Sequence, residues 1–227
     1  PGDYSAELVA AARAFFDQAS EEVLKRISDN VLMGLPGSDD AFELHTFQGL
    51  LDAYKNIGDQ GLRAHLYYFL RQVAPHAEKL GIKLAIHPDD PPFPLLGLPR
   101  VVSTGEDLEQ LLAASEVRAN GLTFCTGSLG VRRDNDVPAL AARFAHRIHF
   151  LHLRTTRRES TRFGSFHEAR HLEGDVNMYH VLAAIQAEHD RRKAHGLTDY
   201  QIPMRPDHGH AILDDLNKKT YPGYTAI

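Results

Sequence analysis

The chain has 227 residues, of which 43% are hydrophobic and 24% are charged. This composition is typical of a globular protein with a sizeable core, and it excludes the disordered and collagen-like classes. The formal net charge is −5 and the Lys and Arg residues are scattered among Asp and Glu, so we expect no nucleic-acid partner.

The sequence gives no sign of a secreted or membrane-bound protein. Cys125 is the single cysteine, which excludes an internal disulfide. No apolar stretch approaches the roughly 18 residues that suggest a membrane span, and the first four residues lack the basic start of a secretory signal. We therefore expect a cytoplasmic protein with no membrane partner. Since the sequence does not begin with Met, we also expect that residues precede it.

Helices are predicted for much of the first eighty residues. Ser5 is a suitable N-cap for a helix from Ala6 to Gln18, and Ser20 for a helix from Glu21 to Leu32. A longer amphipathic helix is predicted from Asp59 to Leu80.

After Gly81 the pattern changes to short apolar runs that alternate with helices. The helices are expected at Glu106 to Ala119, Asp136 to Ala145 and Val176 to Ala194. Such alternation indicates βα units and a parallel sheet.

Four of the short apolar runs are followed by a side chain that can bind a metal ion: His87, Cys125, His152 and Asp207. Parallel strands of a barrel deliver such side chains to one rim. A complete (β/α)8 barrel typically needs about 250 residues. We therefore predict an α/β fold, a (β/α)8 TIM barrel that is incomplete in this chain, with residues 1–227 as one domain and a fragment of a longer catalytic domain.

Two imidazoles, a thiolate and a carboxylate form a ligand set of mixed softness. It suits Mn, Fe, Co or Zn better than Ca or Mg. The alternative for Cys125 is a small buried apolar side chain. We favour ligation because Thr126-Gly127-Ser128 follows directly and is predicted to be a tight polar turn at the strand end. Asp89 and Asp90 follow His87 closely, and we expect them to orient its imidazole.

His149 and His152 lie three residues apart on one predicted strand, so they point to opposite faces. Only one can reach the pocket, and His152 is nearer the strand end. Arg154 shares the face of His152 and has two possible roles: it can clamp a carboxylate of the substrate, or it can pair with a structural acid.

The segment Arg205-Pro206-Asp207-His208-Gly209-His210 is dense in polar function. Asp207 is the expected metal ligand, and His208 or His210 is expected to transfer protons.

The segment His167-Glu168-Ala169-Arg170-His171 matches the H-E-x-x-H pattern of zinc proteases. Glycines at 164 and 174 leave little room for the helix that this motif needs. We predict a loop instead, in which His167 or His171 either contacts substrate or is structural.

Several segments together resemble the mannonate dehydratase family, over about Thr46 to Ile227. They are His87-Pro88-Asp89-Asp90-Pro91-Pro92, Gly97-Leu98-Pro99-Arg100, Asn120-Gly121 with Cys125-Thr126-Gly127-Ser128, His152-Leu153-Arg154, Phe166-His167-Glu168 with His171-Leu172, and Arg205-Pro206-Asp207-His208-Gly209-His210.

The resemblance implies a (β/α)8 lyase that removes water from D-mannonate to give 2-keto-3-deoxy-D-gluconate in glucuronate catabolism. It implies a divalent metal, Mn²⁺ or Fe²⁺, on the same four ligands. A histidine of the Asp-His-Gly-His segment and Tyr224, with Tyr221 as competitor, are the implied acid and base. Which is acid and which is base stays open.

The resemblance also implies further contacts of the active site and of the whole protein. Arg154 and Arg205 are the expected ligands of the substrate carboxylate or hydroxyls, and Asn120 is expected to shape the pocket floor. A small sugar acid is the expected partner, and a homodimer is plausible by family analogy alone. Two alternatives are a metal-dependent sugar isomerase on the same barrel and an inactive metal- or sugar-binding relic.

Overall fold

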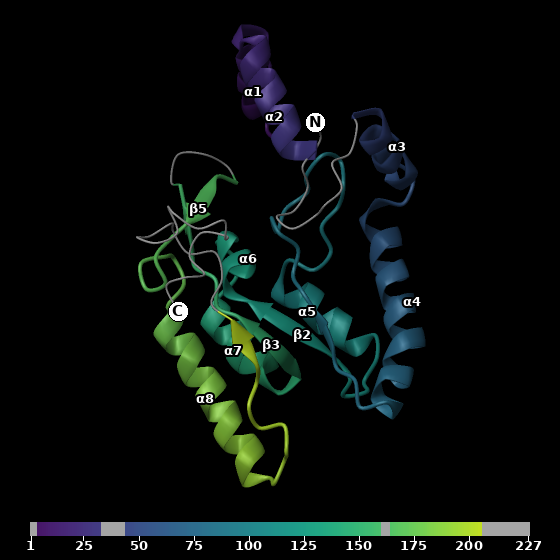
Figure 1. The fold of residues 1–227 in the computed structure, drawn as a ribbon, viewed down its shortest axis with the longest axis vertical. Coiled ribbons are helices and arrows are strands. Elements are labelled where there is room, and N and C mark those ends of the chain that lie inside the picture. The colour runs from purple at the N-terminus through teal and green to yellow at the C-terminus, as the bar shows by residue number, and fades with distance from the viewer. Residues whose placement is uncertain (1–3, 33–43, 160–163, 206–227) are drawn as a thin grey trace, which may run out of the picture. The chain divides into compact units, whose positions relative to one another are not determined.

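The computed structural model describes residues 4–32, 44–159 and 164–205 (Figure 1). By their contacts these residues fall into two compact units. One consists of the residues before Asp59 together with Leu96–Leu98, and the other of the remaining residues from Asp59 onward. None of the described helices combines the length and the apolar character that a bilayer crossing requires.

The described residues of the first unit contain three helices: α1 (Ala6–Gln18), α2 (Glu21–Leu32) and α3 (Leu44–Tyr54). Both predicted serine caps are present. The Leu8 N–H donates to Ser5 Oγ over 3.2 Å and the Val23 N–H donates to Ser20 Oγ over 3.4 Å. Both helices also begin and end at the predicted residues.

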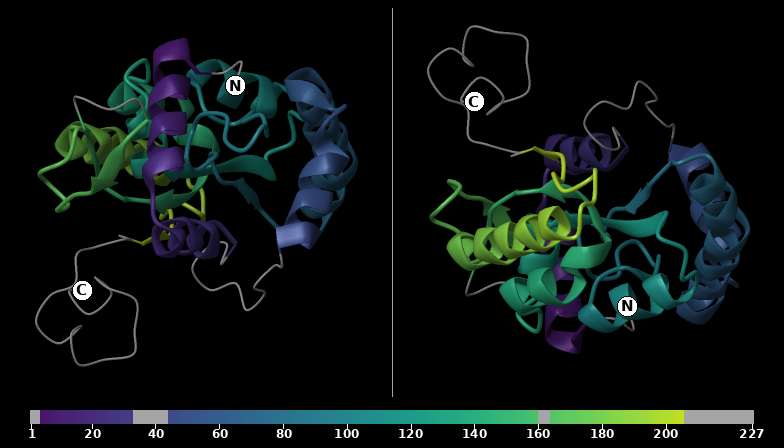
Figure 2. Two further views of the ribbon diagram at one scale, coloured as in Figure 1. Left: turned by 90° about the horizontal axis from the view of Figure 1, so that it is seen from above. Right: turned by 90° about the horizontal axis from the view of Figure 1, so that it is seen from below.

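The second unit contains the other helices. They are α4 (Gly58–Lys79), of which Gly58 belongs to the first unit, α5 (Gly105–Ala113), α6 (Thr126–Val131), α7 (Val137–Phe144), a 3-10 turn (Ala145–Arg147) and α8 (Met178–Ala194). The long helix predicted from residue 59 to 80 is confirmed to within one residue at each end. Figures 1 and 2 show α4 and α8 on opposite sides of the strands.

Helix α5 is shorter than predicted, because it ends at Ala113 rather than at residue 119. The Asn120 side-chain amide donates to the carbonyl oxygens of Leu111 and Ser115, over 3.0 Å each. These bonds satisfy carbonyl groups that a helix end leaves without a partner. The buried Asn120 thus closes the end of α5, and strand β2 starts at the same residue.

Within the described part of the second unit, four strands form a parallel sheet at its centre (Figure 1). The strands are β1 (Leu84–Ile86), β2 (Asn120–Cys125), β3 (Ile148–His152) and β6 (Met204–Arg205), in the order β1-β2-β3-β6. The parallel pairing confirms the α/β class. Closure into an eight-stranded barrel and a single domain over residues 1–227 stay predictions.

Two segments near the carboxyl ends of the strands differ from expectation. Thr126–Ser128 is not an isolated turn but the start of α6, with Cys125 as the N-cap residue. The segment around His167 is a loop only in part. Its first residues form strand β5 (Phe166–Glu168), which pairs antiparallel with β4 (Thr156–Arg158). The prediction that this H-E-x-x-H match is not a helix is confirmed.

The apolar core fills the space between the sheet and the helices. Every residue of β2 is buried, as expected for a parallel strand covered on both faces. Phe124 and Leu122 of β2 and Ile148 of β3 are at most 1% exposed, as is Val181 of α8. The packed strands therefore fix the positions of the residues at their carboxyl ends.

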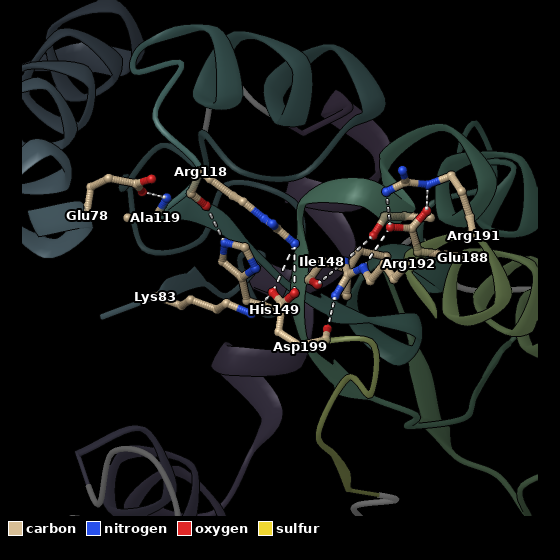
Figure 3. Close-up of polar contacts among 11 residues, drawn as sticks. Glu78, Lys83, Arg118, Ala119, Ile148, His149, Glu188, Arg191, Arg192 and Asp199 are labelled. Atoms are coloured by element: carbon tan, nitrogen blue, oxygen red, sulfur yellow. Dashed lines mark hydrogen bonds and ion pairs between the residues drawn. The ribbon is translucent and has the colours of Figure 1, made fainter. Parts of the chain in front are cut away.

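The amino ends of the strands are held by a network of charged side chains (Figure 3). Asp199, in the segment before β6, forms ion pairs with Lys83 and with Arg118. Arg192 of α8 is 1% exposed, bonds to Glu188, and donates to the carbonyl oxygens of Ala145 and Ile148. The network joins α8 and the start of β6 to the starts of the first three strands.

Replacing Arg192 by Met should lower the free energy of unfolding by about 3–5 kcal/mol, because the buried carbonyl groups of Ala145 and Ile148 lose their donor and Glu188 keeps only its bonds to Arg191. Arg191→Met is the matched control: Arg191 bonds to the same Glu188, but its side chain is 46% exposed, so the loss should stay below about 1 kcal/mol. Urea unfolding of the protein at its natural length measures both, and equal losses would contradict a structural role for the buried arginine.

Candidate metal centre

Three potential metal ligands meet at the carboxyl edge of the sheet. His87 directly follows β1, Cys125 is the last residue of β2 and His152 is the last residue of β3. The register pairs Cys125 with His152. Since parallel strands point the same way, their ends deliver these side chains to one place.

The three side chains lie close enough to share one ion. Their ligand atoms all lie within 4.8 Å of one another. The His87 Nε2 atom is 3.1 Å from His152 Nδ1, and the two ring centroids are 5.4 Å apart. Cys125 and His152 are buried, whereas His87 is exposed. Two of the three ligand residues are thus shielded from solvent, and His87 is the solvent-exposed one.

The hydrogen bonds of His87 suit a metal ligand. Its Nδ1 lies 2.6 Å from the carbonyl oxygen of Pro88. A carbonyl oxygen can only accept, so Nδ1 carries the proton and the lone pair of a neutral ring is on Nε2. Metal-binding histidines usually donate their second ring N–H in this way. The expectation that Asp89 and Asp90 orient this imidazole is wrong, because the backbone of Pro88 does so.

Cys125 lies in surroundings that favour its thiolate. Burial alone raises the pKa of the thiol, but hydrogen bonds and charge from His152 and His87 outweigh burial and lower the pKa to about 5. The Ser128 N–H and Oγ also lie 3.4 and 3.2 Å from the sulfur. The charge of the sulfur acts in return on His87: burial lowers the pKa of that imidazole, but the hydrogen bond and charge of Cys125 raise it overall.

These observations fit a divalent metal ion. Metal bonds to nitrogen and sulfur are roughly 2.0–2.3 Å long, so ligand atoms that lie within 4.8 Å of one another can share one ion after small side-chain shifts. Two imidazole nitrogens face each other beside a thiol that is readily ionised. His87, Cys125 and His152 can therefore hold a metal ion together.

His149, the other histidine of β3, is directed away from this group. Its Nε2 lies 2.8 Å from the carbonyl oxygen of Arg118. Burial lowers the pKa of His149 to about 4, so the ring is neutral near pH 7. A Cβ atom at Gly121 would lie 2.2 Å from His149 Cδ2. Glycine at 121 therefore makes room for the ring.

Arg154 lies beside the cluster and is bound by two protein carboxylates. Its Nε lies 2.9 Å from Oε1 of Glu168, and its Nη1 contacts Asp90. Its side chain is 6% exposed. Of the two roles considered for Arg154, this structure contains the pairing with protein acids.

The expected ligands from the last strand are only partly described. Arg205 ends β6 and pairs with His152, and its carbonyl oxygen accepts from the Leu153 N–H over 3.0 Å. The backbone of Arg205 therefore lies next to a ligand. Asp207, His208, His210 and Tyr224 lie outside the described residues, so their roles stay predictions.

The structure does not bring Asn120 to the cluster, because Asn120 begins β2 whereas Cys125 ends it. His167 is 52% exposed, and its Nδ1 lies 3.9 Å from Oε1 of Glu159. His171 is exposed, and its carbonyl oxygen accepts from Thr155 Oγ1. Substrate contacts of these three residues remain predictions that the described contacts do not support.

Two residues next to the cluster were not assigned their partners from sequence. The sequence predicts that Asp90 orients the imidazole of His87, and it indicates Glu168 only as part of the H-E-x-x-H pattern. Both contact Arg154, from 64 and 14 residues away along the chain. The available signals were the adjacent acids Asp89 and Asp90, the acid Glu168, and an arginine just after a predicted strand.

The family model described as D-mannonate dehydratase (UxuA) matches residues 3–227. A mannonate dehydratase of Chromohalobacter salexigens is 50% identical, and one of Marinomonas sp. is 48% identical, each over 99% of this chain. The chain spans 57% of the length of either relative.

Among solved structures, the crystal structure of mannonate dehydratase from Streptococcus suis serotype 2 matches with a TM-score of 0.67 and 33% identity. That match covers 85% of this chain and 51% of the other. The agreement of the family model, two close relatives and a solved structure, over nearly the whole chain, shows that this chain belongs to the D-mannonate dehydratase family.

Proposed function

We propose that this chain is part of a hydro-lyase that converts D-mannonate to 2-keto-3-deoxy-D-gluconate with the help of Mn²⁺ or Fe²⁺. The observation that carries the proposal is the group of His87, Cys125 and His152 at the carboxyl edge of the sheet, in a chain that belongs to the family. The substrate is a small sugar acid, and the reaction removes a proton from C2 and hydroxide from C3.

The three described ligands would hold the ion, and Asp207 is proposed as the fourth. A divalent cation at such a site supplies positive charge next to the substrate carboxylate and so favours loss of the weakly acidic C2 proton. The mixture of imidazole, thiolate and carboxylate suits Mn²⁺ or Fe²⁺ better than Mg²⁺.

The described residues hold the proposed metal ligands in fixed positions. The Pro88 carbonyl fixes the ring of His87, and the pairing of β2 with β3 fixes Cys125 against His152. A substrate would approach the group from the side of His87, which is the solvent-exposed ligand residue.

Proton transfer is proposed for the segment that follows β6 and for a tyrosine further on. One histidine, His208 or His210, and Tyr224 would remove the C2 proton and protonate the leaving hydroxyl group. Arg205 is the proposed ligand of the substrate carboxylate. Such positioned acids and bases typically contribute 10²–10⁴-fold in rate.

The first experiment is an assay on D-mannonate with the protein at its natural length, stripped of metal and then resupplied with Mn²⁺ or Fe²⁺. A metal-dependent 2-keto-3-deoxy acid, lighter than the substrate by one water, supports the proposal. A product of unchanged mass would indicate a sugar isomerase. A folded, metal-loaded sample that makes no product would indicate binding without turnover.

Replacing Cys125 by Ser should weaken metal binding, because a hydroxyl group replaces a thiolate ligand. The loss should exceed the roughly 10–100-fold that removal of an outer-shell partner costs. Metal content and competition titration measure the affinity, and with Co²⁺ the thiolate charge-transfer absorption should disappear. His180→Asn is the control, because His180 is exposed on α8 and lies outside the cluster. Unchanged metal affinity in the serine variant would remove Cys125 from the ligand set.

Replacing Tyr224 by Phe should leave bound metal unchanged and lower kcat by about 10²–10⁴-fold, since the ring stays and the transferable proton is lost. Tyr221→Phe is the matched control and should keep most of the activity. Steady-state kinetics with metal analysis of the same samples decides between the two tyrosines. Near-normal turnover of the Tyr224 variant would exclude it from proton transfer.

A further inference from the structure

We propose that Arg154 is a positioning residue, which clamps the loop after His87 and the β4–β5 hairpin against the metal centre and thereby sets metal affinity. This inference rests on the proposed function only in taking the cluster as a metal site. It assigns Arg154 to the protein's own carboxylates instead of the substrate's.

The place of Arg154 is defined by close packing. Arg154 follows His152 by two residues, so both side chains leave the chain on the same side. The aliphatic stem lies against Gly127 in the first turn of α6, where an added Cβ would be 2.5 Å from Arg154 Cγ. The Thr126 hydroxyl donates to the Arg154 carbonyl oxygen over 2.6 Å. The position of the guanidinium group is thus determined by the turn that follows the ligand Cys125.

All three guanidinium nitrogens donate to protein carboxylates. Nε lies 2.9 and 3.2 Å from the two oxygens of Glu168, Nη2 bonds to the same carboxylate, and Nη1 bonds to Asp90. A planar guanidinium group suits such a bidentate pair, and a buried cation requires it. A substrate carboxylate would have to compete with two internal ones.

The two acids belong to segments that are far apart in the sequence. Asp90 lies three residues after His87, in a loop whose other acid, Asp89, accepts from the Val102 N–H over 2.8 Å. Glu168 ends β5, where it pairs with Thr156 of β4. Arg154 therefore links the loop that carries one ligand to the hairpin that follows another.

The hairpin has further attachments, which make the link testable without loss of the fold. The Arg158 guanidinium donates to the Gly130 carbonyl oxygen over 2.6 Å and pairs with Asp175. The Thr156 hydroxyl donates to the Gly127 carbonyl oxygen over 3.1 Å. Weakening the Arg154 pairs should therefore loosen the His87 loop at Asp90, while Asp89 stays bonded to Val102 and the hairpin stays on α6.

The test replaces Arg154 by Lys, which keeps the charge but cannot bond to both carboxylates in the fork geometry. We expect metal affinity to fall by about 10–100-fold, the usual effect of losing an outer-shell partner. With Co²⁺, the ligand-field absorption should change in intensity while the thiolate band persists. Arg157→Lys is the matched control: Arg157 is exposed on β4, and its variant should bind metal like the unchanged protein.

Glu168→Gln provides a second route to the same answer if the Arg154 variant does not fold, because Glu168 is 29% exposed and keeps its shape. Glu168→Gln should also lower the metal affinity, as Arg154→Lys does. The double variant should bind metal no more weakly than Arg154→Lys alone, since both changes break one link. Affinities of both single variants within twofold of the unchanged protein would overturn the proposal.

Kinetics on D-mannonate separates this proposal from the alternative. If Arg154 holds the substrate, Arg154→Lys should raise KM for mannonate and leave metal affinity unchanged, which would overturn the positioning role. Metal binding by the unchanged protein without mannonate turnover would contradict the proposed dehydratase activity, whereas the effect of Arg154 on metal affinity would still hold.

Discussion

The site depends on one constraint of the backbone, the parallel register of β2 and β3. It places Cys125 opposite His152, and with β1 on the other side of β2 it brings His87 to the same edge. A shift of one residue would turn either ligand to the opposite face of the sheet. The buried residues of β2 and the charged network at the amino ends both hold this register.

The two ends of the sheet have different tasks. At the amino ends, charged groups are neutralised by one another and by backbone carbonyl groups, as Arg192 and Asp199 are. At the carboxyl ends, a thiol and two imidazoles are close together, and the facing ring nitrogens of His87 and His152 are 3.1 Å apart. Stability at one end and chemistry at the other is the usual division in barrels of parallel strands.

The parts of the structure that depend on neighbouring residues could be predicted from the sequence. The serine caps of α1 and α2 and the apolar runs before His87, Cys125 and His152 are local signals, and the structure has these elements. The end of α5 was missed because a side chain from the next strand, Asn120, determines it. The three-residue strands of the β4–β5 hairpin are too short to show a period of two.

The same distinction applies to the site. The three ligands each follow a short apolar run, so the sequence pattern indicated them. The partners of Arg154 come from a loop and from β5, which only the fold brings together. Because many sequence positions separate these groups, no local pattern contains the information.

Gly127 shows how a residue without a functional group can be as restricted as a ligand. Its missing side chain is the space that the stem of Arg154 occupies. A methyl group there would push the arginine outward, and with it both segments that the arginine holds. Relatives that carry an arginine at this strand end should therefore keep glycine at the position that follows the cysteine by two. A larger residue at 127 should be tolerated only together with a smaller residue at 154.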